Sequence, residues 1–377
     1  MTVASPRLAP TGGRQPLFGN NPIARAVPGD GDIPLVIDFA MGQLAAGKLE
    51  EAVGYLRFAY NDSGRGRPYL VRAAALQAVA ALLAARSSAA ESMPGVVAVY
   101  TGADTDGVLN PMPCAWVVPD SDVKAVAYPP MAKDVVRYTG DAVAVVVAES
   151  REQAEDALEA INVNYQVLPS VTSPEEATQQ GAPQLHDDAP GNQAFHWIVS
   201  GGDTDAAFQS PEVLVKDTIL QQRLIPNAME TRSAVASYAS AMGDLTLWST
   251  TQNPHIARFL CSLVTGLGEH KIRVIAPEVG GGFGSKIPMY PSEMIAVFCS
   301  MKLGRPVKWT ESRTENYQAT THGRDHIEYV EMAATREGKI TGLRTVVYAG
   351  MGAYLSTAAP GIATILHGLM YLSLIHI

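Results

Sequence analysis

The sequence predicts an α+β fold, because strand-like and helix-like segments follow one another in mixed order along the chain. In the first half, strand-like runs at 96–100 and 163–168 enclose a helical pattern at 152–162. In the second half, strand-like runs at 245–249 and 272–276 are each followed by a helical pattern. With 377 residues, of which 47% are hydrophobic, the chain is long enough for two modest domains with packed cores.

The predicted first domain spans 88–168 and contains three strands before its helix. The run at 96–100 is made of small, β-branched and aromatic residues. The runs at 135–138 and 142–148 flank the turn residues Thr139, Gly140 and Asp141.

The helix of this domain is predicted at 152–162, and a last strand follows at 163–168. Ala154, Leu158 and Ile161 recur at helical spacing and predict the buried face, because the acidic residues lie elsewhere on the helix.

A linker and a second region follow the first domain. Residues 169–200 are rich in proline, glycine and acidic residues, which predicts a linker. From 201 to 377, strands are predicted at 245–249, 272–276, 307–309 and 327–333, and helices at 256–263 and 291–302.

Composition excludes several classes of function. The formal net charge is −9 and no basic cluster occurs, so nucleic acid is not an expected partner. Three scattered cysteines, Cys114, Cys261 and Cys299, provide neither a disulfide framework nor a metal site and indicate a reducing, cytoplasmic location. The apolar run at 73–85 is too short for a membrane span, and polar residues, proline and glycine interrupt the run at 353–377.

The most informative stretch is the glycine-rich loop at 278–286, which follows the strand-like run at 272–276. Three consecutive glycines, then Phe283 and a fourth glycine, leave backbone N–H groups accessible to a polar or anionic cofactor. The loop is neither a P-loop, because Ser285 precedes Lys286, nor a dinucleotide fingerprint, because Ser285 takes the place of its last glycine. A plain turn between strand and helix stays open as an alternative.

Several motifs in order along the chain resemble the large, molybdenum-binding subunit of the xanthine dehydrogenase, aldehyde oxidase and aerobic carbon monoxide dehydrogenase family. The motifs lie at 223–230, 251–255, 278–286, 322–326 and 351–356. The resemblance implies that 88–168 form an a/b hammerhead-like domain, in which 138–141 read Tyr-Thr-Gly-Asp, and that 201–377 form the first part of the molybdopterin-binding region.

By the same resemblance, Gln252 and Phe283 are candidate catalytic residues, and Gln252, Gly281, Gly282, Phe283 and Gly284 are candidate cofactor-binding residues. The side-chain amide of Gln252 is a neutral donor that can orient an oxygen ligand of molybdenum, and Phe283 would shield the metal from water. No side chain is expected to ligate the metal. The alternatives are a turn-capping role for Gln252 and a place in the core for Phe283.

Four further residues have weaker assignments. Glu230 is either a carboxylate near the active site or a solvated or structurally paired acid. Lys286 has no assigned role beyond capping the next helix or pairing with Glu293. His322 and His326 lie four residues apart, but without a helical setting they make a weak metal signal.

The resemblance implies oxidation of a small aldehyde, a heteroaromatic compound or carbon monoxide, with water as the oxygen source. Purines are disfavoured because Ile287 stands where purine-hydroxylating members have a glutamate. The expected cofactor is molybdenum-molybdopterin in its cytosine dinucleotide form, with FAD and 2Fe-2S clusters on partner subunits in a dimer of heterotrimers. The alternative is a non-catalytic cofactor- or nucleotide-binding or assembly module of the same fold.

The two ends of the chain depart from the family pattern. Residues 1–87 are predicted to be divergent or translated in a shifted frame, and 71–81 are alanine-rich and helix-prone. The last six residues resemble translated sequencing-adapter sequence. Because the family's glutamate base lies farther along a full-length chain, we expect a truncated catalytic subunit that is inactive alone.

Overall fold

A computed structural model describes residues 88–114, 122–198 and 200–355, together with the backbones of three earlier strands. These strands are β1 (Ile23–Val27), β2 (Leu35–Phe39) and β3 (Ala80–Arg86). The chain divides into two compact units, Met1–Arg72 with Ser312–Glu315, and Ala73–Glu311 with Asn316–Ile377. In the first unit, β1 and β2 form an antiparallel pair.

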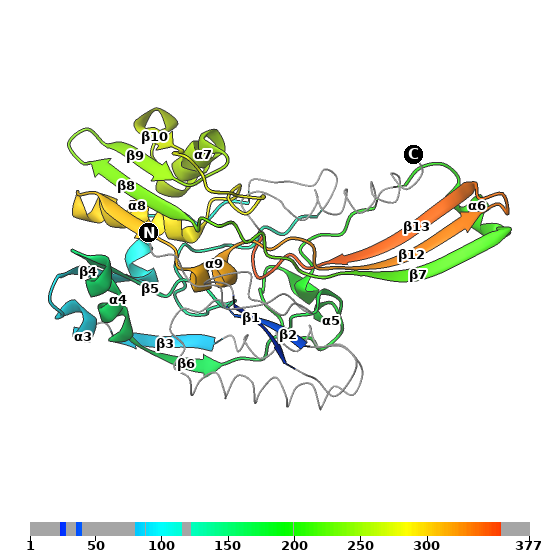
Figure 1. The fold of residues 1–377 in the computed structure, drawn as a ribbon, viewed down its shortest axis with the longest axis horizontal. Helices are drawn as coiled ribbons and strands as arrows, with labels where there is room; N and C mark the ends of the chain where they lie inside the picture. The colour runs from blue at the N-terminus through cyan, green and yellow to red at the C-terminus, as the bar shows by residue number, and fades with distance from the viewer. Residues whose placement is uncertain are drawn as a thin grey trace, which may run out of the picture. The chain divides into compact units, whose positions relative to one another are not determined.

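The first domain contains two antiparallel strand pairs and one main helix (Figure 1), and its strand β3 precedes the predicted boundary at 88. β4 (Val96–Thr101) pairs with β5 (Ala144–Ala148), and β3 pairs with β6 (Asn162–Val167). The helix α4 (Arg151–Glu159) begins at Ser150, whose hydroxyl accepts the N–H of Gln153. Two short helices, α3 (Ser88–Glu91) and η1 (Gly102–Thr105), flank β4. The strands predicted at 96–100 and 163–168 and the helix at 152–162 are therefore confirmed to within a few residues.

Three details of this domain differ from the prediction. Residues 135–138 form no strand. The buried residue of α4 is Ala157, whereas Leu158 is exposed, because only the narrow side of this short helix packs on the strands. Ala80 and Ala81 lie in strand β3 although alanine favours helix, because pairing with β6 overrides this weak local preference.

The second region begins with a four-stranded sheet in the order β10-β9-β8-β11. Its strands are β8 (Ser233–Ala239), β9 (Asp244–Ser249), β10 (Ile272–Ile275) and β11 (Val307–Thr310). The helix α7 (Pro254–Thr265) connects β9 to the parallel strand β10, and α8 (Pro291–Leu303) connects β10 to β11. β8 runs antiparallel to both of its neighbours, so β9, β10 and β11 share one direction. All the predicted elements in this stretch are confirmed.

A separate antiparallel sheet in the order β13-β12-β7 follows in the same unit (Figure 1). It consists of β7 (Val213–Gln221), β12 (His326–Ala334) and β13 (Ile340–Ala349). β12 was predicted at 327–333, whereas β7 and β13 were not predicted.

The remaining helical segments are short. They are α5 (Pro174–Ala177), η2 (Pro190–Asn192), α6 (Thr204–Gln209), η3 (Glu269–Lys271) and α9 (Arg313–Ala319). Most of the predicted linker is irregular, as its composition indicated. No helix in the described part of the chain combines the length and the apolar character that crossing a bilayer requires. All but the first three residues of the apolar run at 353–377 lie outside the described residues.

One hydrophobic core joins the four-stranded sheet to its two helices and to part of the first domain. Leu245 and Leu247 of β9 are fully buried, as are Leu260 of α7 and Phe298 of α8 in the same cluster. Buried residues from the segment between β4 and β5 complete the cluster: Leu109, Met112 and Met131. This core fixes α7 and α8, and therefore also fixes the loops that precede them.

Candidate functional site

Four segments meet at one edge of the β10-β9-β8-β11 sheet. Because β9, β10 and β11 share one direction, the segments that follow them leave the sheet at the same edge. β8 runs the other way, so the segment that precedes it reaches this edge as well. The predicted site residues Gln252, Glu230 and the glycine loop all lie in these segments, and the strand order explains why they meet.

The glycine loop adopts a backbone that most residues avoid. Gly281 and Gly284 have φ angles of 95° and 92°, and Phe283 between them has a φ angle of 50°. A bulky residue in the left-handed region carries a strain of about 1–2 kcal/mol, which glycine avoids. The Phe283 side chain is 74% exposed, so its alternative placement in the core is wrong.

Gln252 is tied to this loop by its side-chain oxygen. Oε1 accepts the N–H groups of Gly284, at 3.1 Å, and of Lys286, at 3.3 Å. Because both partners are donors, the oxygen rather than the nitrogen of the amide must face the loop. The backbone N–H of Gln252 also donates to the Lys286 carbonyl, at 2.9 Å. The Nε2 group is thereby turned away from the loop and stays available as a donor.

A Cβ atom at Gly282 would approach Gln252 Oε1 to 2.3 Å, so only glycine allows this close contact. Among the described residues, the N–H groups of Gly282 and Phe283 have no recorded acceptor, in contrast to those of Gly280, Gly281 and Gly284. The loop therefore has two neighbouring N–H groups next to the Gln252 amide, one on the buried Gly282 and one on the exposed Phe283, that no described residue accepts.

Glu230 and Lys286 form an ion pair next to the glycine loop. The Lys286 Nζ atom lies 2.7 Å from Glu230 Oε2, and the same oxygen accepts the N–H of Gly280 at 2.7 Å. Partial burial would raise the pKa of Glu230, but the hydrogen bonds from Lys286 and Gly280 and the lysine charge outweigh it and lower that pKa. Glu230 is therefore a paired acid, which is one of the two predicted alternatives.

The predicted pairing of Lys286 with Glu293 is wrong. Glu293 lies at the start of α8, where it accepts the N–H of Tyr290 at 3.0 Å and the hydroxyl of Ser249 at 3.3 Å. Burial raises the pKa of Glu293, against the opposing charge of Arg232 and these hydrogen bonds.

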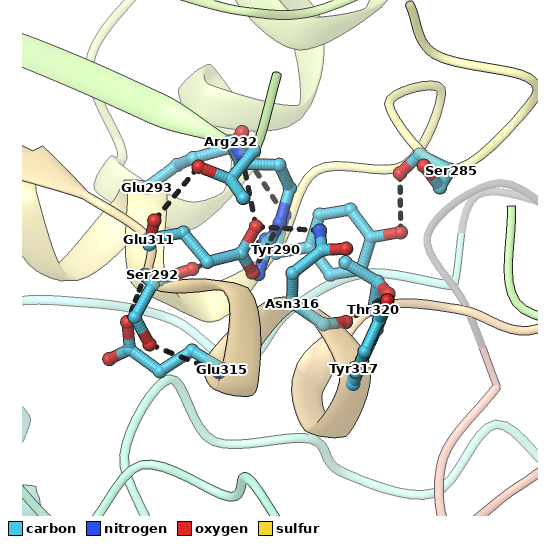
Figure 2. Close-up of polar contacts among 12 residues, drawn as sticks. Arg232, Ser285, Tyr290, Ser292, Glu293, Glu311, Glu315, Asn316, Tyr317 and Thr320 are labelled. Atoms are coloured by element: carbon cyan, nitrogen blue, oxygen red, sulfur yellow. Dashed lines mark hydrogen bonds and ion pairs between the residues drawn. The ribbon is translucent and has the colours of Figure 1, made fainter. Parts of the chain in front are cut away.

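A buried network supports the loop from the side of α8 (Figure 2). Arg232 lies beside Glu311, to which its Nε donates at 3.0 Å, and its guanidinium stacks 3.9 Å from the centre of the Tyr290 ring. The Tyr290 hydroxyl donates to the Ser285 carbonyl at 2.5 Å. Asn316 donates to the other Glu311 oxygen at 2.8 Å. No sequence pattern indicated this network, because Arg232 and Glu311 lie 79 residues apart.

The motif at 322–326 packs on the motif at 223–230. Leu224 and Gly323 exchange two backbone hydrogen bonds, and Arg223 Nε donates to Asp325 at 3.0 Å. His322 contacts the Tyr317 carbonyl, whereas His326 contacts Glu328. The two histidines thus have separate partners, and no group of three or more potential ligands gathers in the described segments.

Comparison with known families divides the chain into three parts. The molybdopterin cofactor-binding domain matches residues 185–372, and the aldehyde oxidase and xanthine dehydrogenase a/b hammerhead domain matches residues 65–169. Residues 1–54 match a different family, malate/L-lactate dehydrogenase. Because the hammerhead match begins at 65, the boundary at 87 stays a prediction.

Individual relatives agree with the two larger matches. The carbon monoxide dehydrogenase large chain of Afipia carboxidovorans is 41% identical over 288 residues, which cover 73% of this chain and 35% of the relative. The nicotine 6-hydroxylase large subunit of Paenarthrobacter nicotinovorans is 38% identical, over 71% of this chain and 32% of the relative. The structure of reconstituted CO dehydrogenase from Oligotropha carboxidovorans superimposes with a TM-score of 0.65 at 37% identity, over 72% of this chain and 35% of that chain. The chain thus spans about a third of the length of these relatives.

Proposed function

The chain belongs to the family of molybdenum-binding large subunits of the xanthine dehydrogenase, aldehyde oxidase and carbon monoxide dehydrogenase type, and we propose that its glycine loop and Gln252 hold part of a molybdopterin cofactor. Members of this family are molybdenum-dependent oxidoreductases. The observation that carries the proposal is the orientation of Gln252, whose oxygen is held by the loop and whose N–H₂ group is thereby free to donate.

The residues present fit such a group. Two backbone N–H donors, at Gly282 and Phe283, and the neutral amide of Gln252 suit oxygen ligands and add no charge to the site. Glycine at 281 and 282 permits the close contacts of the loop, since a Cβ at Gly281 would lie 3.0 Å from the Phe283 ring and one at Gly282 would lie 2.3 Å from Gln252 Oε1. When bound, the molybdenum centre supplies two-electron oxidation with water as the source of oxygen.

Each residue has a specific proposed role. Gln252 donates to an oxygen ligand and orients it, while Gly281, Gly282 and Gly284 let the backbone approach the cofactor. The ring of Phe283, which is exposed, would cover the metal and exclude water from it when the cofactor is bound.

The substrate and the assembly are proposed at a coarser level. Ile287 offers no charged group next to the loop, so a small aldehyde, a heteroaromatic compound or carbon monoxide is a better substrate than a purine. FAD and 2Fe-2S partner subunits would carry electrons away, in a dimer of heterotrimers. A cytoplasmic location agrees with the free thiols of Cys261 and Cys299.

The test is the molybdenum content of the purified chain after co-expression with a molybdopterin supply, measured by mass spectrometry of the metal. We expect bound molybdenum, and CMP after acid hydrolysis if the cofactor is the cytosine dinucleotide form. Gln252→Leu should lower the amount of molybdenum that the chain retains about tenfold, which is the effect of losing one hydrogen bond to a charged group. The matched control, Gln209→Leu at the exposed end of α6, should have no effect. A folded chain that retains no molybdenum would contradict the proposal.

A turnover assay distinguishes the proposed enzyme from the alternative, a non-catalytic module of the same fold. Both would hold the cofactor, but only the enzyme would oxidise substrate when residues 88–355 are placed in a full-length large subunit with its partners.

A further inference from the structure

One carboxylate oxygen joins the two ends of the glycine loop. Glu230 Oε2 accepts the N–H of Gly280, the first glycine near the start of the loop, and the ammonium of Lys286, where the loop ends. A second bond runs the other way, because the N–H of Glu230 donates to the Gly280 carbonyl at 3.2 Å. Glu230 is thus bonded to both ends of the loop.

The fit around this oxygen is tight. A Cβ at Gly280 would approach the Cβ of Glu230 to 2.7 Å, so a side chain at 280 would push the two segments apart. The Lys286 side chain is 1% exposed, whereas that of Glu230 is 36% exposed. The lysine therefore depends on Glu230 for its counter-charge, because an unpaired ammonium is unfavourable in a buried place.

The same two loop ends also hold the proposed cofactor contacts. Between them lie Gly282 and Phe283, whose N–H groups face no recorded acceptor in the described chain. The N–H of Lys286 donates to Gln252 Oε1, so the position of Lys286 also sets the orientation of the Gln252 amide. A shift of either loop end would move the donors at Gly282, Phe283 and Gln252 together.

We propose that Glu230 and Lys286 are a positioning pair that clamps the ends of the glycine loop and presets the donors for the cofactor. This inference rests on the proposed function only for the identity of the ligand. It assigns Glu230 no proton transfer, and it assigns Lys286 a role that the sequence did not indicate.

The clamp makes a specific prediction for single and double variants. Glu230→Gln keeps an oxygen for Gly280 but leaves the Lys286 charge buried without a counter-charge. Lys286→Met removes that charge and one end of the clamp. In the double variant no unpaired charge remains, so its effect should be smaller than the product of the two single effects. Reversal, Glu230→Lys with Lys286→Glu, should not restore the loop, because an ammonium group at position 230 cannot accept the Gly280 N–H.

The experiment combines hydrogen exchange of a peptide covering 279–287 with molybdenum retention during dialysis, in the chain as printed. Glu230→Gln should raise the exchange rate of the loop about tenfold and shorten retention, with a smaller change for Lys286→Met. The matched control is Lys271→Met, which breaks the exposed pair of Lys271 and Asp244 at 3.0 Å and should change neither quantity. Circular dichroism confirms that each variant is folded, and the double variant replaces any single variant that is not.

The outcomes separate the clamp from its alternatives. Unchanged loop exchange in folded Glu230→Gln and in the double variant would overturn the proposal. Loss of turnover in an assembled enzyme with unchanged loop exchange would instead make Glu230 a catalytic group. If wild-type chain retains no molybdenum while the loop responds as described, the proposed function fails and the clamp stands.

Discussion

The helices α7 and α8 have similar ends but very different surroundings. Each begins with a proline in its first turn and ends at a glycine in the left-handed conformation, Gly266 and Gly304. α7 buries one side on the sheet, whereas α8 is buried along most of its length. The reason is that α8 contacts the sheet on one side and Tyr100 of β4 on the other, where the Tyr100 and Phe298 rings meet edge to face at 5.2 Å.

The two helices therefore contribute differently to the candidate site: one anchors the glycine loop, and the other follows the residue that donates. The segment before α7 carries Gln252, an exposed residue whose amide is free to donate. The segment before α8 carries the glycine loop, and Tyr290 at the start of α8 anchors that loop, with Arg232 stacked on the Tyr290 ring. We conclude that α8 provides rigidity and that the start of α7 provides a donor.

The strongest test of this contrast is a matched pair of truncations. Phe298→Ala in α8 should lower the free energy of unfolding by about 3–5 kcal/mol, because the side chain is fully buried. Phe259→Ala in α7 should lower it by about 1 kcal/mol, because that side chain is 44% exposed. Urea unfolding monitored by circular dichroism measures both. Equal losses of unfolding free energy would show that Phe259 is covered in solution, and the two helices would then not differ in burial.

The second test concerns the buried ion pair of Arg232 and Glu311, which lies beside Tyr290 at the start of α8. Glu311→Gln removes the carboxylate that pairs with the buried Arg232 and should lower the free energy of unfolding by about 3 kcal/mol. Asp244→Asn at the exposed pair with Lys271 should change it by less than about 1 kcal/mol. A small effect of Glu311→Gln in the same urea titration would mean that water reaches Arg232.

The third test uses a thiol in each helix. Burial raises the pKa of Cys261 in α7 and of Cys299 in α8 to about 12. Because the pKa of an acid is higher in the folded state than in the unfolded state, the free energy of unfolding should fall as pH rises above about 9. At pH 8 both thiols should react with iodoacetamide at least about 100-fold more slowly than in urea. Faster labelling of Cys261 alone would show that α7 opens locally.

The smallest effect is expected at the helix ends, where the two helices are alike. Gly266→Ala and Gly304→Ala should each lower the free energy of unfolding by about 1 kcal/mol, because φ is 72° and 63° and no atom lies close to the added Cβ. Thermal unfolding should show similar shifts for both variants. Clearly unequal shifts would mean that the difference between the helices extends to their ends.

Local pattern was sufficient for most elements that pack on the core. The helices at 256–263 and 291–302 and the strand at 245–249 were predicted because apolar spacing, proline and glycine agree at these positions. The strand β7 was missed, because its side chains are exposed on both faces and leave no alternation to detect. Leu158 was misplaced because periodicity defines an apolar face of a helix but not how much of it is covered.

The sequence by itself determined the family, the glycine loop and the identity of Gln252 and Phe283 as candidate site residues, because these depend on residue type and order along the chain. Only the tertiary structure decided that Glu230 pairs with Lys286, that Arg232 pairs with Glu311 and that the Gln252 oxygen faces the loop. The physical reason is that charge pairing and amide orientation depend on distances between distant segments, which the order of strands in the sheet sets.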